Sequence, residues 1–150
     1  MDKLEYIPGD LVKVWLDLDL GYQVAEVVGY NPTYQNYILT NWYIEETRGC
    51  ISVAEDRIKQ IPLTSEILEK NGWKKEVMCR GVKNSHWVYT KPDIEEYGYF
   101  PIYIEKGIGD EFDVYPFAGN HDCKQIAYIK YVHQLQHLLF GLGINHEMEV

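Results

Sequence analysis

The sequence predicts an α+β protein: an N-terminal SH3-like small β-barrel, a short helix, and a three-stranded antiparallel sheet with a packed C-terminal helix. Three observations lead to this prediction. Short segments rich in valine and aromatic residues follow one another up to Ile61, which is typical of small barrels. Helix-capping residues come next. Apolar residues spaced three and four positions apart then indicate an amphipathic helix near the end.

Five short segments before Ile61 predict strands, because they are rich in β-branched and aromatic residues and alternate in places. The turn signal Asp19-Leu20-Gly21 joins the first two into a hairpin. A single helical turn at Ala54-Glu55-Asp56 precedes the last strand. Closing the strands into a barrel would remove the exposed edges that short strands otherwise leave. The predicted strands are residues 10–16, 22–30, 34–43, 50–53 and 57–61.

A capped helix is predicted directly after the barrel. Thr64 is a good N-cap, Glu66 lies in the first turn, where the helix dipole favours a negative charge, and Asn71-Gly72 is a stop signal. Turn-forming segments then separate three further strands, and a long amphipathic helix follows. The first helix spans residues 65–70, the strands span residues 77–89, 99–105 and 112–117, and the last helix spans residues 125–142.

The change of pattern near Pro62 divides the chain into a barrel over residues 1–62 and an α+β subdomain over residues 63–150, which we expect to form one compact unit. The chain of 150 residues carries 23 acidic and 14 basic side chains, a net charge of -9. The first part has 10 acidic and 5 basic residues and the second 13 and 9, giving formal charges of -5 and -4. Neither part is a basic nucleic-acid-binding arm or an acidic tail.

A chain of this length buries on the order of 70% of the surface that its unfolded form exposes, so the fold requires no disulfide, metal or cofactor. Cys50, Cys79 and Cys123 are odd in number and form no C-x-x-C pair, which predicts reduced thiols in a cytoplasm. The first residues lack the apolar core of a signal peptide, and no run of about 18 apolar residues occurs. We therefore expect a cytoplasmic protein with no cofactor and no membrane partner.

Two stretches resemble a group of small uncharacterised proteins of gut bacteria and their phage-like mobile elements. Residues 58–64 (IKQIPLT), with Ile67-Leu68 and Gly72-Trp73, are similar to a strand ending in IPLT, a helix, then glycine and an aromatic residue. Residues 131–136 (YVHQLQ) are similar to the closing helix of those proteins. The relatives tend to continue with an alanine and a Thr-Gly stop, where Gly141-Leu142-Gly143 stands here. The resemblance implies an architecture and a bacterial or phage-like origin, and it carries no activity.

Two segments match pieces of a two-metal phosphoesterase signature, in which carboxylates and imidazoles hold two cations. They are residues 109–113 (GDEFD) and 119–122 (GNHD), but only five residues separate them, and the upstream D-x-H is missing. A metal-dependent hydrolase is therefore the third and least favoured function. We assign no catalytic and no metal-binding residue.

His133 and His137 lie four positions apart, so one helical face would carry both. A metal hydrolase would need a glutamate base after the first histidine, and Gln134 stands there instead. We expect one histidine to form a hydrogen bond at the boundary between helix and sheet, and the other to be solvated.

The segment 73–91 carries five basic side chains and one acidic one, interleaved with Trp87 and Tyr89, as on surfaces that bind single-stranded nucleic acid. The next segment, 92–113, carries seven acidic residues and one lysine. Cross-strand pairing of the two would neutralise the patch, and lysines that protect an edge strand would look the same. A nucleic-acid-associated accessory protein is the alternative function, opposed by the net charge. Its candidate residues are Lys74, Lys75, Arg80 and Lys83.

Aromatic residues are abundant in the predicted barrel. Small barrels bind extended peptides in aromatic-lined grooves, and tyrosine combines apolar area with a polar tip. Packing within the strands would explain many of these rings equally well. We expect a non-catalytic interaction or accessory module that binds a protein partner through the barrel. Its candidate binding residues are Tyr22, Tyr34, Tyr37 and Trp42.

Overall fold

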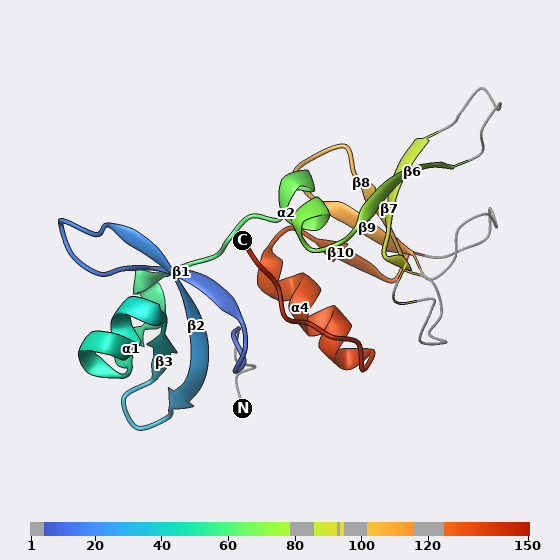
Figure 1. Ribbon diagram of the computed structural model, residues 1–150. Coiled ribbons are helices and arrows are strands. Elements are labelled where there is room, and N and C mark those ends of the chain that lie inside the picture. The colour runs from blue at the N-terminus through green and yellow to red at the C-terminus, as the bar shows by residue number, and fades with distance from the viewer. Residues whose placement is uncertain (1–4, 79–85, 93, 95–101, 116–124) are drawn as a thin grey trace. The chain divides into compact units, whose positions relative to one another are not determined.

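The computed structural model describes residues 5–78, 86–92, 94, 102–115 and 125–150. The fold is α+β, as predicted, with two antiparallel sheets of five strands and few helices (Figure 1). The chain divides into an amino-terminal unit, Met1–Ile61 with Tyr131–His137, and a second unit, Pro62–Lys130 with Leu138–Val150. Within the described part of the chain, no helix has the length and apolar character needed to span a membrane.

The amino-terminal unit contains a sheet with the strand order β4-β3-β2-β1-β5. The predicted hairpin is confirmed, since Leu11 pairs with Glu26 and Trp15 with Tyr22. The predicted helical turn is also confirmed, as the 3-10 helix η1 (Glu55–Arg57). The strands are β1 (Leu11–Trp15), β2 (Tyr22–Asn31), β3 (Asn36–Thr40), β4 (Ile51–Ala54) and β5 (Ile58–Lys59).

The strand pairings leave β4 and β5 at the two edges of this sheet. Within the described residues, β4 pairs only with β3, β5 pairs only with β1, and no pairing joins β4 to β5. The hydrogen-bonded ladder therefore does not close into a barrel, which would require every strand to have two neighbours.

Alternation along the strands determines which face of the first sheet is buried. In β1, Val12 and Val14 are buried while Lys13 and Trp15 are exposed, as the two-residue period of a strand requires. The buried face packs into one apolar cluster. Its members are Tyr6, Val12, Val14, Ala25, Val27, Tyr37, Leu39, Ile44, Val53 and Ile58.

The strand predicted over residues 34–43 is too long, because a helix begins within it. Helix α1 (Trp42–Arg48) starts after Asn41, whose side-chain oxygen accepts a hydrogen bond from the Ile44 N–H at 2.8 Å. Glu45 adds a negative charge to the first turn, which the helix dipole favours. The cap therefore outweighs the β-propensity of the residues that follow it.

Replacing Asn41 by alanine is expected to lower the free energy of unfolding by about 1–2 kcal/mol, since it removes both the cap and a second hydrogen bond. That second bond runs from the Asn41 amide to the Val24 carbonyl over 2.9 Å. Urea denaturation would measure the loss. Asn41→Asp keeps the capping oxygen and should recover about half of it. An alanine variant as stable as the natural chain would contradict this role.

The second unit begins with helix α2 (Ser65–Lys70), which is confirmed as predicted. The Thr64 hydroxyl accepts a hydrogen bond from the Ile67 N–H at 3.3 Å. The sheet that follows has the strand order β10-β9-β8-β7-β6, and its buried residues include Trp73, Tyr89 and Phe112. The strands are β6 (Lys74–Met78), β7 (His86–Thr90), β8 (Tyr103–Lys106), β9 (Phe112–Tyr115) and β10 (Ala127–Ile129).

The prediction of three strands in this sheet is wrong, because two predicted elements are each divided. The strand expected over residues 77–89 is a hairpin, in which Lys74 of β6 pairs with Thr90 of β7. The helix expected over residues 125–142 begins as β10, paired with β9, and helix α4 (Val132–Gly141) starts only afterwards. The spacing of Ile126 and Ile129 suits a helix, but β-branched residues also suit a strand that has a partner.

Helix α4 is divided between the two units, although the sequence predicts that it packs on the second sheet. Its first residues, up to His137, belong to the amino-terminal unit, while the rest belong to the second unit. Within the amino-terminal unit, polar side chains of residues 131–137 therefore contact the start of β1.

Candidate functional site

Two exposed aromatic rings lie side by side at the end of the β1–β2 hairpin. Trp15 and Tyr22, called here the aromatic pair, are directly opposite in the register, with ring centroids 5.1 Å apart at an interplanar angle of 73°. Their exposed fractions are 38% and 43%. The Lys59 ammonium lies 4.2 Å from the centroid of the Tyr22 ring. The edge-to-face contact and the cation together hold an apolar surface in a defined orientation.

A groove of about 170 Å³, called here the β4 groove, opens beside the aromatic pair. One wall is formed by Trp15 and Leu16 at the end of β1, and another by Ile44 of α1. The three consecutive residues Ile51, Ser52 and Val53 of β4 also line it. Polar groups line this groove together with the apolar side chains, and such polar groups fix the orientation of what binds.

The four predicted binding residues lie in different environments. Tyr22 belongs to the aromatic pair, and Tyr34 is 73% exposed in the turn between β2 and β3. Tyr37 is buried in the core, where the Tyr6 N–H donates a hydrogen bond to its hydroxyl, so packing explains it. Trp42 begins α1. The sequence prediction missed Trp15, although its place opposite Tyr22 follows from the hairpin register.

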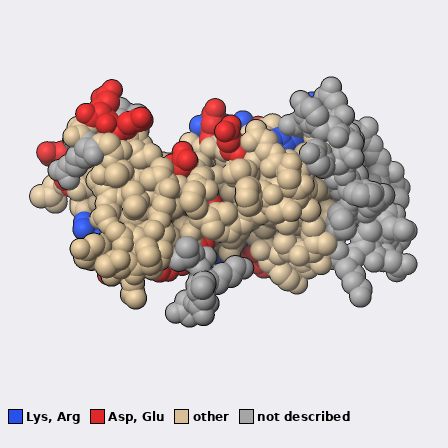
Figure 2. Space-filling view, turned by 90° about the horizontal axis from the view of Figure 1, so that it is seen from below, with Lys and Arg blue, Asp and Glu red and all other residues tan. Residues whose placement is uncertain are grey.

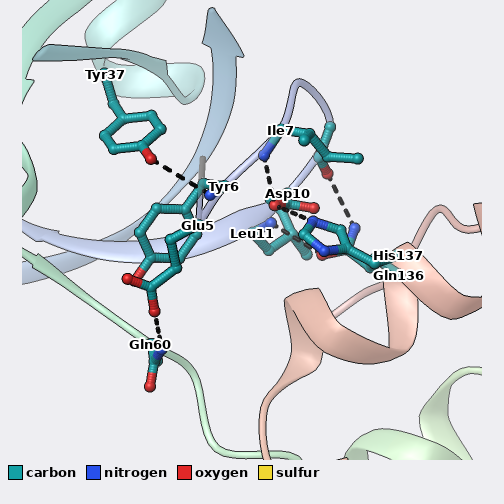
Figure 3. A network of polar contacts seen from close by, with 10 residues as sticks. Glu5, Tyr6, Ile7, Asp10, Leu11, Tyr37, Gln60, Gln136 and His137 are labelled. Atoms are coloured by element: carbon teal, nitrogen blue, oxygen red, sulfur yellow. Dashed lines mark hydrogen bonds and ion pairs between the residues drawn. The ribbon is translucent and has the colours of Figure 1, made fainter. Parts of the chain in front are cut away.

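A buried carboxylate connects the start of β1 to helix α4 within the amino-terminal unit (Figure 3). Asp10 is 1% exposed, accepts a hydrogen bond from the Ile7 N–H at 2.8 Å and lies 2.7 Å from Nε2 of His137. The imidazole of His137 is partly exposed. A buried carboxylate needs such partners, because an unpaired charge in the interior is costly.

Gln136 makes a second connection between the same two segments. Its side chain is 2% exposed, its carbonyl oxygen accepts a hydrogen bond from the Leu11 N–H at 3.0 Å, and its amide donates to the Gly9 carbonyl at 2.9 Å. The Gln136 side chain thus forms a hydrogen bond with one backbone group on each side of Asp10, as the backbone of a neighbouring strand would. The arrangement fixes the first part of α4 on the start of β1.

His133 is surrounded by aromatic rings one turn earlier in α4. The ring centroids of Tyr6, His137 and Tyr131 lie 5.1, 5.6 and 6.0 Å from its own. Its Nδ1 atom is buried and has no hydrogen-bond partner in the described part of the chain. Burial lowers the pKa of His133, an effect that the nearby Asp10 carboxylate partly offsets.

The two histidines therefore differ from the expectation in one respect. His137 forms the expected hydrogen bond, but the prediction of a solvated partner is wrong, because His133 is 3% exposed. Across the described ranges, no group of three or more histidine, cysteine or acidic side chains is placed to hold a metal ion. Of the two phosphoesterase-like pieces, residues 119–122 lie outside the described residues, and Asp113 accepts a hydrogen bond from the Gln125 amide.

Two of the four predicted nucleic-acid-binding residues lie on an edge strand of the second sheet. The basic and acidic segments are neighbours in the sheet, since β7 pairs with β8 and Val88 lies opposite Glu105. Lys74 and Lys75 themselves lie on β6 at the edge, where they face Thr90 and Tyr89 of β7. The Lys75 ammonium lies 5.2 Å from the ring centroid of Trp87, whose side chain is 55% exposed. The other two candidates, Arg80 and Lys83, lie outside the described residues.

Comparisons with protein families, with characterised proteins and with solved structures found no match.

Proposed function

We propose that the chain is a non-catalytic, cytoplasmic protein-binding module that holds a segment of its partner in the β4 groove. The observation that carries this proposal is the exposed aromatic pair beside a groove that both apolar and polar residues line. Large rings held in place by each other offer much apolar area at a small cost in side-chain entropy, which is why tryptophan and tyrosine are enriched at binding hot spots.

We propose further that the amino-terminal unit is an SH3-like small barrel. Its strand order, in which the last strand returns to pair with the first, supports this assignment, as does the single 3-10 turn before that strand. Helix α1 is an addition between β3 and β4, and it supplies Ile44 to the groove. We keep as a proposal the relationship to small proteins of gut bacteria and phage-like elements that residues 58–64 and 131–136 suggest.

Trp15→Ala is expected to weaken partner binding at least tenfold, about 1.4 kcal/mol, because it removes a groove wall and one ring of the pair. Affinity purification from cells that carry the gene would identify the partner, and titration with the purified partner would measure the loss. Trp87→Ala is the matched control, because it removes another exposed tryptophan from the second unit. A partner retained equally by both variants would contradict binding in the β4 groove.

A second function, association with nucleic acid, is favoured by the placement of Lys75 over the exposed Trp87 ring. Cations for phosphate and rings for bases are the two parts of a single-strand-binding surface. If this function holds, a fluorescein-labelled oligothymidine of about 20 nucleotides, a length of roughly one binding site or more, should bind in low salt and dissociate as salt rises.

Changing Lys74 and Lys75 together to glutamate should weaken that binding about tenfold or more, since two phosphate contacts are replaced by repulsion. Trp15→Ala should leave it unchanged. If fluorescence anisotropy detects no binding at about 50 mM salt, where phosphate contacts are strong, the nucleic-acid function is rejected.

A further inference from the structure

We infer that the partner segment is an extended strand rich in lysine or arginine, which adds to the free edge of β4 and places an apolar side chain in the β4 groove. This inference rests on the proposed function, and it adds the mode of recognition and the chemistry of the partner. Two features of the amino-terminal unit carry it: the edge position of β4 beside the groove, and the negative charge of the unit.

Strand β4 presents a free edge beside the groove. Its pairing with β3 runs from Ala54, opposite Asn36, to Ile51, opposite Leu39. Within the described residues, no second strand pairs with it. Every other backbone N–H and C=O on such an edge points away from the sheet and can pair with an added strand. Consecutive residues of a strand point to opposite faces. A groove that touches Ile51, Ser52 and Val53 in succession therefore runs along the edge of β4.

The free edge of β4 favours an extended segment over a helix, because only an extended backbone can pair with the edge of a sheet. The groove of about 170 Å³ suits a small number of side chains. In an extended peptide, alternate side chains point the same way, so one can enter between Trp15 and Ile44 while its neighbours point outward.

The amino-terminal unit that contains the groove carries more carboxylates than cationic groups. One of each, Asp17 and Arg57, lines the groove itself. Glu45 and Glu46 are exposed on the same turn of α1 as the lining residues Ile44 and Thr47, on other faces of the helix. Met1–Ile61 contains 10 acidic and 5 basic residues, and Tyr131–His137 contains neither. On the face of the molecule in Figure 2, more of the surface is coloured for Asp and Glu than for Lys and Arg. Such a surface attracts a cationic segment and repels an acidic one.

A second hollow in the amino-terminal unit has three acidic residues in its lining. It measures about 550 Å³ and is lined by Glu5, Glu55 and Asp56 together with Tyr6, Ile58 and Gln60. The hydrogen bond that Glu55 makes with the Glu5 carboxyl raises the pKa of Glu55, as expected where two carboxylates lie close together. A lysine or arginine of the partner would offset their mutual repulsion.

The inference is tested by selecting peptides from a random display library of about 12 residues, long enough to span a strand, against the full chain, with the Trp15→Ala variant as counter-selection. We expect the selected peptides to alternate apolar residues with lysine or arginine. Methylating one set of alternate amide nitrogens in a selected peptide should abolish binding, and methylating the other set should be tolerated, because only one set faces β4.

Glu45→Gln with Glu46→Gln should weaken binding of the selected peptide about fivefold at roughly 50 mM salt and hardly at all at about 500 mM, where charges are screened. Peptides that bind through the groove but are acidic, or that tolerate both methylation patterns, would overturn the inference and leave the proposed function standing. Peptides unaffected by Trp15→Ala, or no peptide at all, would contradict both. A dimer of the chain that Trp15→Ala dissociates would make a second copy the occupant and also overturn the inference.

Discussion

Gln136→Glu is expected to lower the free energy of unfolding at pH 7 by about 3 kcal/mol or more, the usual effect of an uncompensated buried charge. In the natural chain, the amide nitrogen of Gln136 donates to the Gly9 carbonyl, and its oxygen accepts from the Leu11 N–H. A glutamate side chain retains the acceptor but places a second oxygen against the Gly9 carbonyl. The new carboxylate is also buried and lies near Asp10, since both contact the same turn of chain.

Urea denaturation at pH 7 and pH 5 would measure this effect. Protonation of the introduced carboxyl group restores a hydrogen-bond donor, so the deficit relative to the natural chain should be smaller at pH 5. Gln134→Glu is the matched control in the same helix: the Gln134 oxygen accepts from the Tyr131 N–H at 3.2 Å, a role that a carboxylate also fills. A deficit below about 1 kcal/mol for Gln136→Glu, the worth of an ordinary hydrogen bond, would contradict the proposed connection.

Acidification is expected to destabilise the amino-terminal unit through His133. Burial lowers the pKa of His133 in the folded chain, so below the ordinary histidine pKa of about 6.5 the unfolded chain binds a proton more readily. The contribution of neutral His133 is therefore complete above about pH 6.5 and is lost as the pH falls toward the lowered folded pKa. Asp10 attracts the proton and His137 repels it, and both effects are smaller than that of burial.

His133→Phe separates this titration from that of other groups. Phenylalanine keeps a ring between Tyr6 and Tyr131 but has nothing to protonate, so its free energy of unfolding should change less between about pH 7.5 and pH 5 than that of the natural chain. Urea denaturation at several pH values gives the two slopes. Equal slopes would show that His133 is not the group responsible.

Local signals account for the elements that were predicted correctly. In the β1–β2 turn, the Asp17 carboxylate accepts hydrogen bonds from the N–H groups of Asp19 and Leu20 at 2.9 and 2.8 Å. Thr64 caps α2 in the same local way. Such bonds join residues two or three positions apart, so their signals are present in a short stretch of sequence.

Elements that depend on competition or on distant partners were predicted poorly. The Asn41 cap competes with two β-prone aromatic residues, and β10 depends on β9 as a pairing partner. The residues of the candidate site also differ in whether a local pattern or a distant contact places them. Tyr22 was predicted, but the groove beside it depends on α1 and β4 meeting β1. The contact of Asp10 with His137 joins residues 127 positions apart, which no local pattern indicates.

The assignment of Tyr131–His137 to the amino-terminal unit has a consequence for how the protein is made. During synthesis, the residues that form the first sheet leave the ribosome early, but Gln136 and His137, which bond to the start of β1, leave only after the whole segment 62–130. Domains usually fold one after another from the amino terminus. Here the amino-terminal unit stays incomplete until residues 62–130 of the second unit have been synthesised. Its final folding step therefore closes a loop of more than a hundred residues and is expected to be slow.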